Sequence, residues 1–180
     1  DAAVRQPGDR DRLERLLVEL GRRARGPGDV FLTGGATALL HGWRASTVDV
    51  DLKLDPEPPG IFEAIAKLKN ELDVNIELAS PDLFIPPVPG WRDRSESIAT
   101  HGEVRFFHYD LRGQALSKLA RSHERDLHDV CAMVEGGHVT RDALRAAYAA
   151  SEGDLIRYPA LDADKLAARV KTFLDDDDAG

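Results

Sequence analysis

The chain has 180 residues and a mass of 19.8 kDa, which is enough for one domain with its own core and short for two independent domains. Its 42% hydrophobic and 31% charged residues are typical of a soluble globular protein, and no apolar run reaches the roughly 18 residues that a membrane span needs. The formal net charge of −8 argues against broad, sequence-independent binding to a nucleic-acid backbone, although a local basic groove is compatible with it.

The first part of the chain predicts a sheet with crossover helices. Leucines recur at helical spacing over residues 9–25, and Gly26-Pro27-Gly28 ends that helix. A short apolar run over residues 30–32 predicts a buried strand that ends at Gly34. The elements predicted after it are a helix over residues 35–43, a strand over 48–54, a helix over 61–72 and a strand over 74–78.

The strand over residues 48–54 alternates between apolar and charged side chains. Val48, Val50, Leu52 and Leu54 share the face that we expect to be buried, and Asp49, Asp51 and Lys53 share the other. Side chains two residues apart on a strand lie roughly 6.5–7 Å apart on one face. The two aspartates can therefore converge on hard cations that remove their mutual repulsion, and oxygen ligands suit magnesium or manganese. The alternative is a solvated face of an edge strand.

Gly34-Gly35 lies between a predicted strand and a predicted helix. Such a turn places backbone N–H groups and the positive end of the helix dipole where phosphate oxygens can bind. A glycine pair alone occurs in many tight turns. Together with the acidic pair on the following strand, it predicts a triphosphate held at the helix and metal ions that bridge it to Asp49 and Asp51.

The rest of the chain predicts a helical part. A Pro-rich segment over residues 80–94 is either a rigid surface crossing or a lid that faces a substrate, and residues 97–109 predict a hairpin that turns at His101-Gly102. Helices are predicted over residues 114–121, 125–135, 140–150 and 162–173. The fold class is therefore α+β, a single domain of residues 1–180. It has a small mixed β-sheet core over about residues 1–110 and a C-terminal helical bundle over about residues 111–180, with the active site between them.

The single cysteine, Cys131, excludes an internal disulfide framework and fits a reducing cytoplasm. Its apolar neighbours within residues 127–133 indicate a small core residue rather than a nucleophile. On the same predicted helix, Asp126 and Asp129 are three residues apart and so share one face, where they can orient a lysine or an arginine.

The glycine and aspartate motifs resemble the signature of polymerase-beta-type nucleotidyltransferases, in which a glycine followed by Gly or Ser precedes an acid-hydrophobic-acid strand. More narrowly, the pattern is similar to bacterial minimal nucleotidyltransferases of the AbiEii type, many of which are toxins of toxin–antitoxin pairs. The residues that carry this likeness are Gly34 to Leu39, Arg44, Thr47, Asp49 and Asp51. A second block, Lys118 with Arg125 to Asp129, resembles elements on that family's C-terminal helices.

The resemblance implies an enzyme that moves a nucleoside monophosphate from an NTP to an acceptor hydroxyl. Asp49 and Asp51 would ligate two Mg²⁺ or Mn²⁺ ions with a third carboxylate from a neighbouring strand. For that third ligand we expect Glu77, in the middle of its strand, with Asp73 as the competitor; Asn75 shares the face of Glu77 but supplies no charge.

The resemblance also implies a set of phosphate ligands. Lys118 would neutralise a phosphate, and Arg44 would do the same or pin the aspartate strand. Many relatives carry serine at the position of Gly35, so the hydroxyl is missing here unless Thr33 or Thr37 replaces it. The expected nucleotide-binding residues are Gly34, Gly35, Thr37, Arg44 and Lys118.

The acceptor stays open at this point. Relatives suggest a tRNA 3′ end or a protein hydroxyl, and a toxin role would bring a cognate antitoxin protein as partner; no membrane partner is expected. One alternative is a non-catalytic nucleotide-sensing or protein-binding module on the same fold. Another is an aminoglycoside-type nucleotidyltransferase, which an acidic pocket for a polycationic molecule would indicate.

Overall fold

The computed structural model describes residues 9–176, so the first eight and last four residues of the predicted domain lie outside it. The chain forms two compact units. The first contains the residues up to Ala79 together with Ser97–His108, and the second contains Ser80–Glu96 and the chain from Tyr109 onward. The Pro-rich segment, which the sequence pattern grouped with the sheet core, thus belongs to the helical unit.

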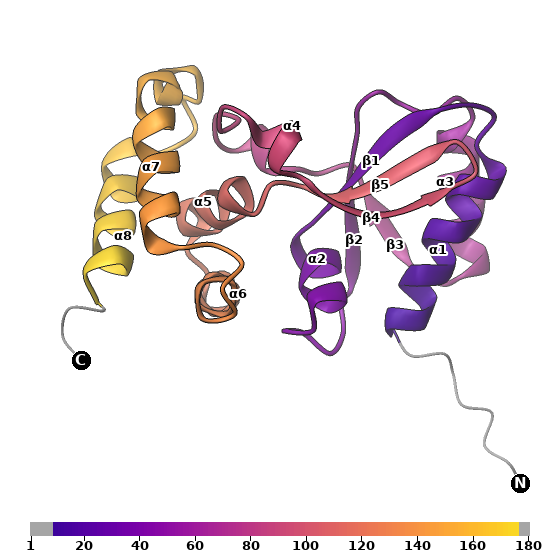
Figure 1. Ribbon diagram of the computed structural model, residues 1–180, viewed down its shortest axis with the longest axis horizontal. Coiled ribbons are helices and arrows are strands. Elements are labelled where there is room, and N and C mark those ends of the chain that lie inside the picture. Colours follow the sequence, from indigo (N-terminus) through magenta and orange to yellow (C-terminus); the bar gives the residue numbers. More distant parts are fainter. Residues whose placement is uncertain (1–8, 177–180) are drawn as a thin grey trace, which may run out of the picture. The chain divides into compact units, whose positions relative to one another are not determined.

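The first unit is built on a mixed sheet with the strand order β3-β2-β1-β5-β4 (Figure 1). Its strands are β1 (Gly28–Thr33), β2 (Asp49–Leu54), β3 (Asn75–Glu77), β4 (Glu96–His101) and β5 (Val104–His108). β1 pairs antiparallel with β2 and parallel with β5, and β2 pairs parallel with β3. The predicted mixed sheet and the α+β class are confirmed.

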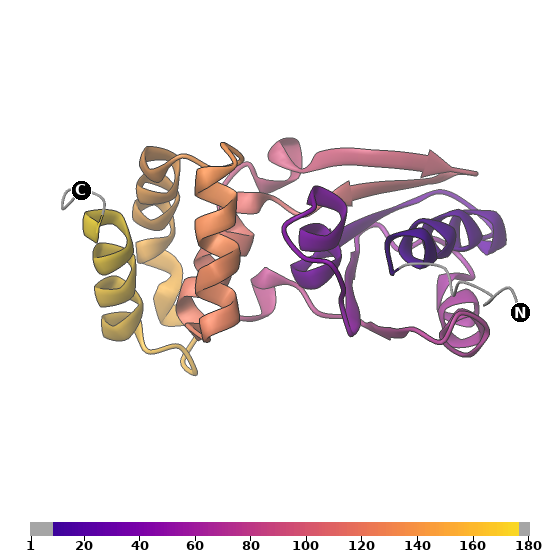
Figure 2. The ribbon, with the colours of Figure 1, turned by 90° about the horizontal axis from the view of Figure 1, so that it is seen from below.

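The core of the first unit lies on one face of this sheet. The helices α1 (Asp9–Arg23) and α3 (Ile61–Glu71) pack there, and their apolar side chains form one buried cluster with Val50, Leu52 and Ile76 of the sheet (Figures 1 and 2). Burying each such side chain contributes about 1.5–3 kcal/mol. Because alternate strand residues point to opposite faces, this packing directs the charged residues of β2 to the other face.

One residue of the predicted apolar face lies outside the core. Val48 precedes β2 and is 80% exposed, because the strand begins at Asp49 rather than at residue 48. The buried side of the strand therefore starts with Val50.

The second unit is a helical bundle around α5 (Leu111–Arg121), which contacts each of the three helices after it. These are α6 (Glu124–Glu135), α7 (Arg141–Ser151) and α8 (Ala163–Asp175), and they follow the predicted bounds closely (Figure 2). Thr140 and Asp162 cap α7 and α8, since each side chain accepts a hydrogen bond from the backbone N–H three residues on. The short helices η1 (Pro81–Leu83), α4 (Trp91–Arg94) and η2 (Glu152–Arg157) were not predicted.

Cys131 is exposed on α6, so its prediction as a core residue is wrong. The buried residues of this helix are Asp126, Asp129, Val130 and Met133, which follow the helical repeat. Cys131 is one residue after Val130, about 100° further around the helix, and so points away from that stripe. None of the helices that the structure describes is long and apolar enough to cross a membrane.

Candidate functional site

An acidic face on the first unit is formed by the neighbouring strands β2 and β3. Their parallel register sets Asp49 opposite Asn75 and Asp51 opposite Glu77. The residues between them, Val50 and Ile76, are buried on the core side, so these four polar side chains share the other face. The structure thus places on one face of the sheet the three carboxylates that the sequence assigned to the metal.

The amide of Asn75 links two of these carboxylates. Its Nδ2 donates to Asp49 Oδ1 at 2.6 Å and to Glu77 Oε1 at 3.1 Å. Two donated hydrogen bonds lessen the repulsion between the charges. The sequence placed Asn75 on this face but assigned it no role, although its position two residues before Glu77 was the available signal.

The donor atoms of this face suit a hard cation. Every candidate ligand is a carboxylate oxygen, which is the type that magnesium and manganese prefer. Within residues 9–176, however, no group of three or more His, Cys, Asp and Glu side chains is close enough to hold a metal ion. An ion held between Asp49 and Glu77 would take the place of the two hydrogen bonds that Asn75 donates to them.

Asp73, the competing third carboxylate, lies before β3 in a turn with a φ of 50°. Its carbonyl oxygen accepts a hydrogen bond from Arg12 Nη1 at 3.4 Å. The structure places Glu77, and not Asp73, in the strand position opposite Asp51.

The start of helix α2 (Gly34–His41) lies beside Asp51. Gly34 adopts a φ of +60°, a left-handed conformation that suits glycine, as the chain turns from β1 into the helix. A Cβ atom on Gly34 would lie 3.2 Å from Asp51 Oδ2. The N-terminal end of α2 and an acidic side chain therefore meet at one point.

The segment before β2 folds back over the first turn of α2. A Cβ atom on Gly35 would overlap the Thr47 hydroxyl and would lie 3.5 Å from Arg44 Nη1. The structure thus brings Arg44 to the end of the helix where the sequence expected phosphate to bind. It also brings Thr47 there, a residue that belongs to the sequence motif but was assigned no role.

A family model described as a nucleotidyltransferase of unknown function (DUF6036) matches residues 12–171, which is most of the chain. The chain belongs to this nucleotidyltransferase family. The family description supports the predicted superfamily and nucleotidyl transfer as the general kind of reaction. No curated protein and no solved structure was found to match the chain.

In the first unit, the hydroxyl of Thr37 lies in the interior. The residue is fully buried, its Oγ1 donates to the Leu32 carbonyl at 3.2 Å, and it lies 3.1 Å from His108 Nδ1. These contacts join α2 to β1 and β5. The hydroxyl is therefore used in packing, which leaves it no surface on which to meet a phosphate.

Lys118 lies inside the second unit. It is 5% exposed, and its Nζ is 2.8 Å from Asp129 Oδ2 and 3.7 Å from Asp126 Oδ1. Asp126 also pairs with Arg121 at 2.7 Å, so the two aspartates orient a lysine and an arginine as their spacing predicted. Burial raises the pKa of Asp126, but the hydrogen bond and charge of Arg121, the charge of Lys118 and the backbone N–H of His123 outweigh it and lower the pKa overall.

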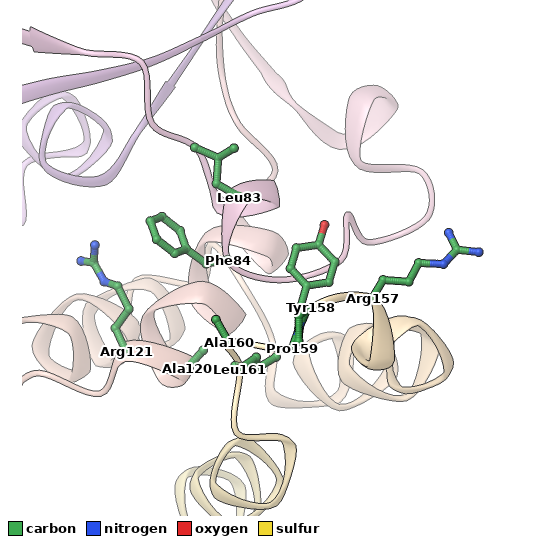
Figure 3. A pocket seen from close by; sticks show the side chains of 9 residues that line it. All are labelled: Leu83, Phe84, Ala120, Arg121, Arg157, Tyr158, Pro159, Ala160 and Leu161. Carbon is green, nitrogen blue, oxygen red and sulfur yellow. The ribbon is translucent and has the colours of Figure 1, made fainter.

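The second unit also contains a pocket of about 480 Å³ (Figure 3). It is lined by Leu83, Phe84, Ala120, Arg121, Arg157, Tyr158, Pro159, Ala160 and Leu161. Its polar side chains have internal partners, since Arg121 pairs with Asp126, Arg157 with Asp154, and the Tyr158 hydroxyl donates to the Asp82 carbonyl. None of the predicted nucleotide or metal ligands lines this pocket.

Proposed function

We propose that this protein transfers a nucleoside monophosphate from an NTP to an acceptor hydroxyl with the help of Mg²⁺. In this reaction the acceptor oxygen bonds to the α-phosphorus, the bond from that phosphorus to pyrophosphate breaks, and the hydroxyl proton leaves to water. Membership of a nucleotidyltransferase family supports the reaction type. The metal, the NTP and the acceptor are part of the proposal.

The observation that carries the proposal is the approach of Gly34 to Asp51. The first turn of α2 offers backbone N–H groups and a positive dipole end, which suit phosphate oxygens. A carboxylate alone at that place would repel the same phosphate. Since Asp51 Oδ2 lies close to Gly34, 3.2 Å from where a Cβ would stand, a cation that binds both the carboxylate and the phosphate would remove this repulsion.

The roles of the other residues follow from their positions. Asp49, Asp51 and Glu77 share one sheet face and would hold the metal ions, for which their oxygen atoms are suitable ligands. When bound, Mg²⁺ would neutralise the triphosphate and lower the pKa of the attacking hydroxyl. Arg44, whose Nη1 lies beside Gly35, would contribute a positive charge to the phosphates at the start of α2.

The acceptor in this proposal is a tRNA 3′ end or a hydroxyl group of a protein. Its support is the likeness of the Gly34-Gly35 and Asp49-to-Asp51 motifs, with Arg44 and Thr47, to AbiEii-type enzymes. The same likeness supports a toxin that works in the cytoplasm and has a cognate antitoxin protein, and this support is analogy alone.

The test is a labelling reaction. The purified protein is incubated with Mg²⁺, each of the four α-labelled NTPs in turn, and either total tRNA, a protein extract or an aminoglycoside mixture. We expect label in the RNA or protein fraction, lost when a chelator removes the metal. Binding of Mg²⁺–NTP without any transfer would instead identify a nucleotide-sensing module, and label on the aminoglycoside would identify a small-molecule enzyme.

Glu77→Gln is expected to lower transfer by about a hundredfold or more, because it removes the third charged ligand but keeps the side-chain size. Asp73→Asn is the matched control and is expected to keep transfer near the wild-type rate, since its side chain lies outside β3. Initial rates of both variants at saturating Mg²⁺ make the comparison. The opposite pattern, with Asp73→Asn inactive and Glu77→Gln active, would show that the third ligand is misassigned.

Gly34→Ala is expected to weaken Mg²⁺–NTP binding, because the added methyl group reaches Asp51. Gly42→Ala is the control: Gly42 also has a positive φ, 91°, but a Cβ there meets nothing within 4 Å. Both variants should lose about 1–2 kcal/mol of unfolding free energy from the left-handed conformation. Calorimetric binding should separate them, and equal NTP affinity in the two variants would contradict the site.

A further inference from the structure

Position 35 and position 47 compete for the same space. A Cβ atom on Gly35 would overlap the Thr47 hydroxyl and would lie 3.0 Å from the Thr47 Cβ. Real Cβ atoms do not approach another atom as closely as this one would approach the hydroxyl, and the branched Thr47 side chain has little freedom to rotate away. Gly35 does not have a left-handed φ, so its backbone would accept another residue. What excludes a side chain at position 35 is Thr47.

Thr47 is held from both sides. Its Oγ1 donates to the carbonyl oxygen of Asp49 at 2.8 Å, which is the first residue of β2. Its backbone N–H donates to Asp9 Oδ2 at 3.2 Å, at the start of α1. The hydroxyl therefore lies against the first turn of α2 and is hydrogen-bonded to the beginning of the strand that carries both aspartates.

We propose that Thr47 is the positioning residue of this site: its hydroxyl occupies the place of a side chain on residue 35 and sets the acidic strand against the N-terminus of α2. This inference rests on the proposed nucleotidyl transfer. It accounts for the glycine at position 35 of this chain, because the Thr47 hydroxyl fills the space that a side chain there would need. Thr47 therefore affects nucleotidyl transfer through the positions of Asp49 and of the start of α2.

The hydroxyl is tested by Thr47→Val, which keeps the branched shape and removes the hydrogen bond to Asp49. We expect kcat to fall about tenfold, the factor that one lost hydrogen bond gives, with KM for the NTP little changed. Thr47→Ser keeps the hydroxyl and should restore kcat to within about twofold of wild type. The control Val48→Ala, on the exposed neighbouring residue, should leave both constants unchanged. Equal kcat in Thr47→Val and wild type would overturn the proposal.

The shared space is tested without any nucleotide. Gly35→Ala should move the denaturation midpoint to lower denaturant in the wild-type background, and the same change should have little effect when Thr47→Gly has cleared the space. An equal shift in both backgrounds would overturn the steric part. This measurement needs no enzymatic activity. If the wild-type protein transferred no nucleotide, the proposed function would be contradicted, but the steric coupling between positions 35 and 47 could still be measured.

Discussion

Asp51→Asn is expected to lower nucleotidyl transfer by about a thousandfold, since a catalytic metal supplies several kcal/mol of transition-state stabilisation and each 1.36 kcal/mol is a factor of ten. The substitution keeps the size of the side chain and removes its charge. Asp51 is the carboxylate that faces both the Gly34 turn and Glu77, so the loss falls where the helix end and the acidic face meet. Single-turnover rates with saturating Mg²⁺–NTP are the measurement.

The same variant should fold as well as the wild type or better. Asp49, Asp51 and Glu77 are like charges on one face, and neutralising one of them in the metal-free protein relieves repulsion, which offsets the lost attraction of Asp51 to the start of α2. A raised thermal midpoint together with lost transfer is the pattern of a functional residue that costs stability, and an unchanged midpoint shows that transfer is lost without loss of the fold. Glu57→Gln, which neutralises an exposed acid after β2, is the control and should change neither quantity. Transfer within tenfold of wild type in Asp51→Asn would contradict the assigned site.

The acidic face could be predicted because it depends on the simplest rule of strand geometry. Alternation over residues 48–54 sets Asp49 and Asp51 on one side, and the short strand at residues 75–77 repeats the pattern with Asn75 and Glu77. The sequence did not show the register in which β2 and β3 pair. It requires the crossover through α3 to bring β3 beside β2 in parallel, which sets Glu77 opposite Asp51.

The surroundings of Gly35 could not be predicted in the same way. Residues 42–48 connect α2 to β2 and have no regular hydrophobic period that would reveal their path. The return of this segment over the helix depends on single contacts, such as the hydrogen bond from the Thr47 backbone to Asp9. Thr37 was predicted to lie in α2, but its burial could not be predicted. The Thr37 side chain is fully buried because that side of α2 packs against β5.

The Pro-rich segment shows a different limit. Prolines and glycines interrupt hydrophobic periodicity, so residues 80–94 read as a loop, and their place in the chain grouped them with the sheet core. In the structure the segment contains η1 and α4 and joins the helical unit, where Arg94 forms a two-point ion pair with Asp110 at the start of α5. A contact between residues sixteen positions apart leaves no local signal in the sequence.

Lys118→Met is expected to lower the free energy of unfolding by about 3–5 kcal/mol, because it leaves a buried carboxylate without its cation. Asp129 is 0% exposed, and its Oδ2 receives the Lys118 ammonium at 2.8 Å, so water cannot replace the lost partner. The matched control is Arg145→Met, which breaks the exposed ion pair with Asp142 and should cost about 0–1 kcal/mol. Denaturant titrations at pH 7 measure both variants.

The double variant Lys118→Met, Asp129→Leu separates stability from chemistry. Replacing a whole buried ion pair by apolar side chains of similar volume is often neutral or stabilising, so the double variant should regain most of the stability that the single variant loses. If Lys118 also neutralises a phosphate, as the family resemblance implied, the folded double variant should still transfer nucleotides far more slowly than wild type. Full transfer in a stable double variant would show that Lys118 has a purely structural role. A double variant that is no more stable than Lys118→Met would show that the stability of the bundle does not depend on this ion pair.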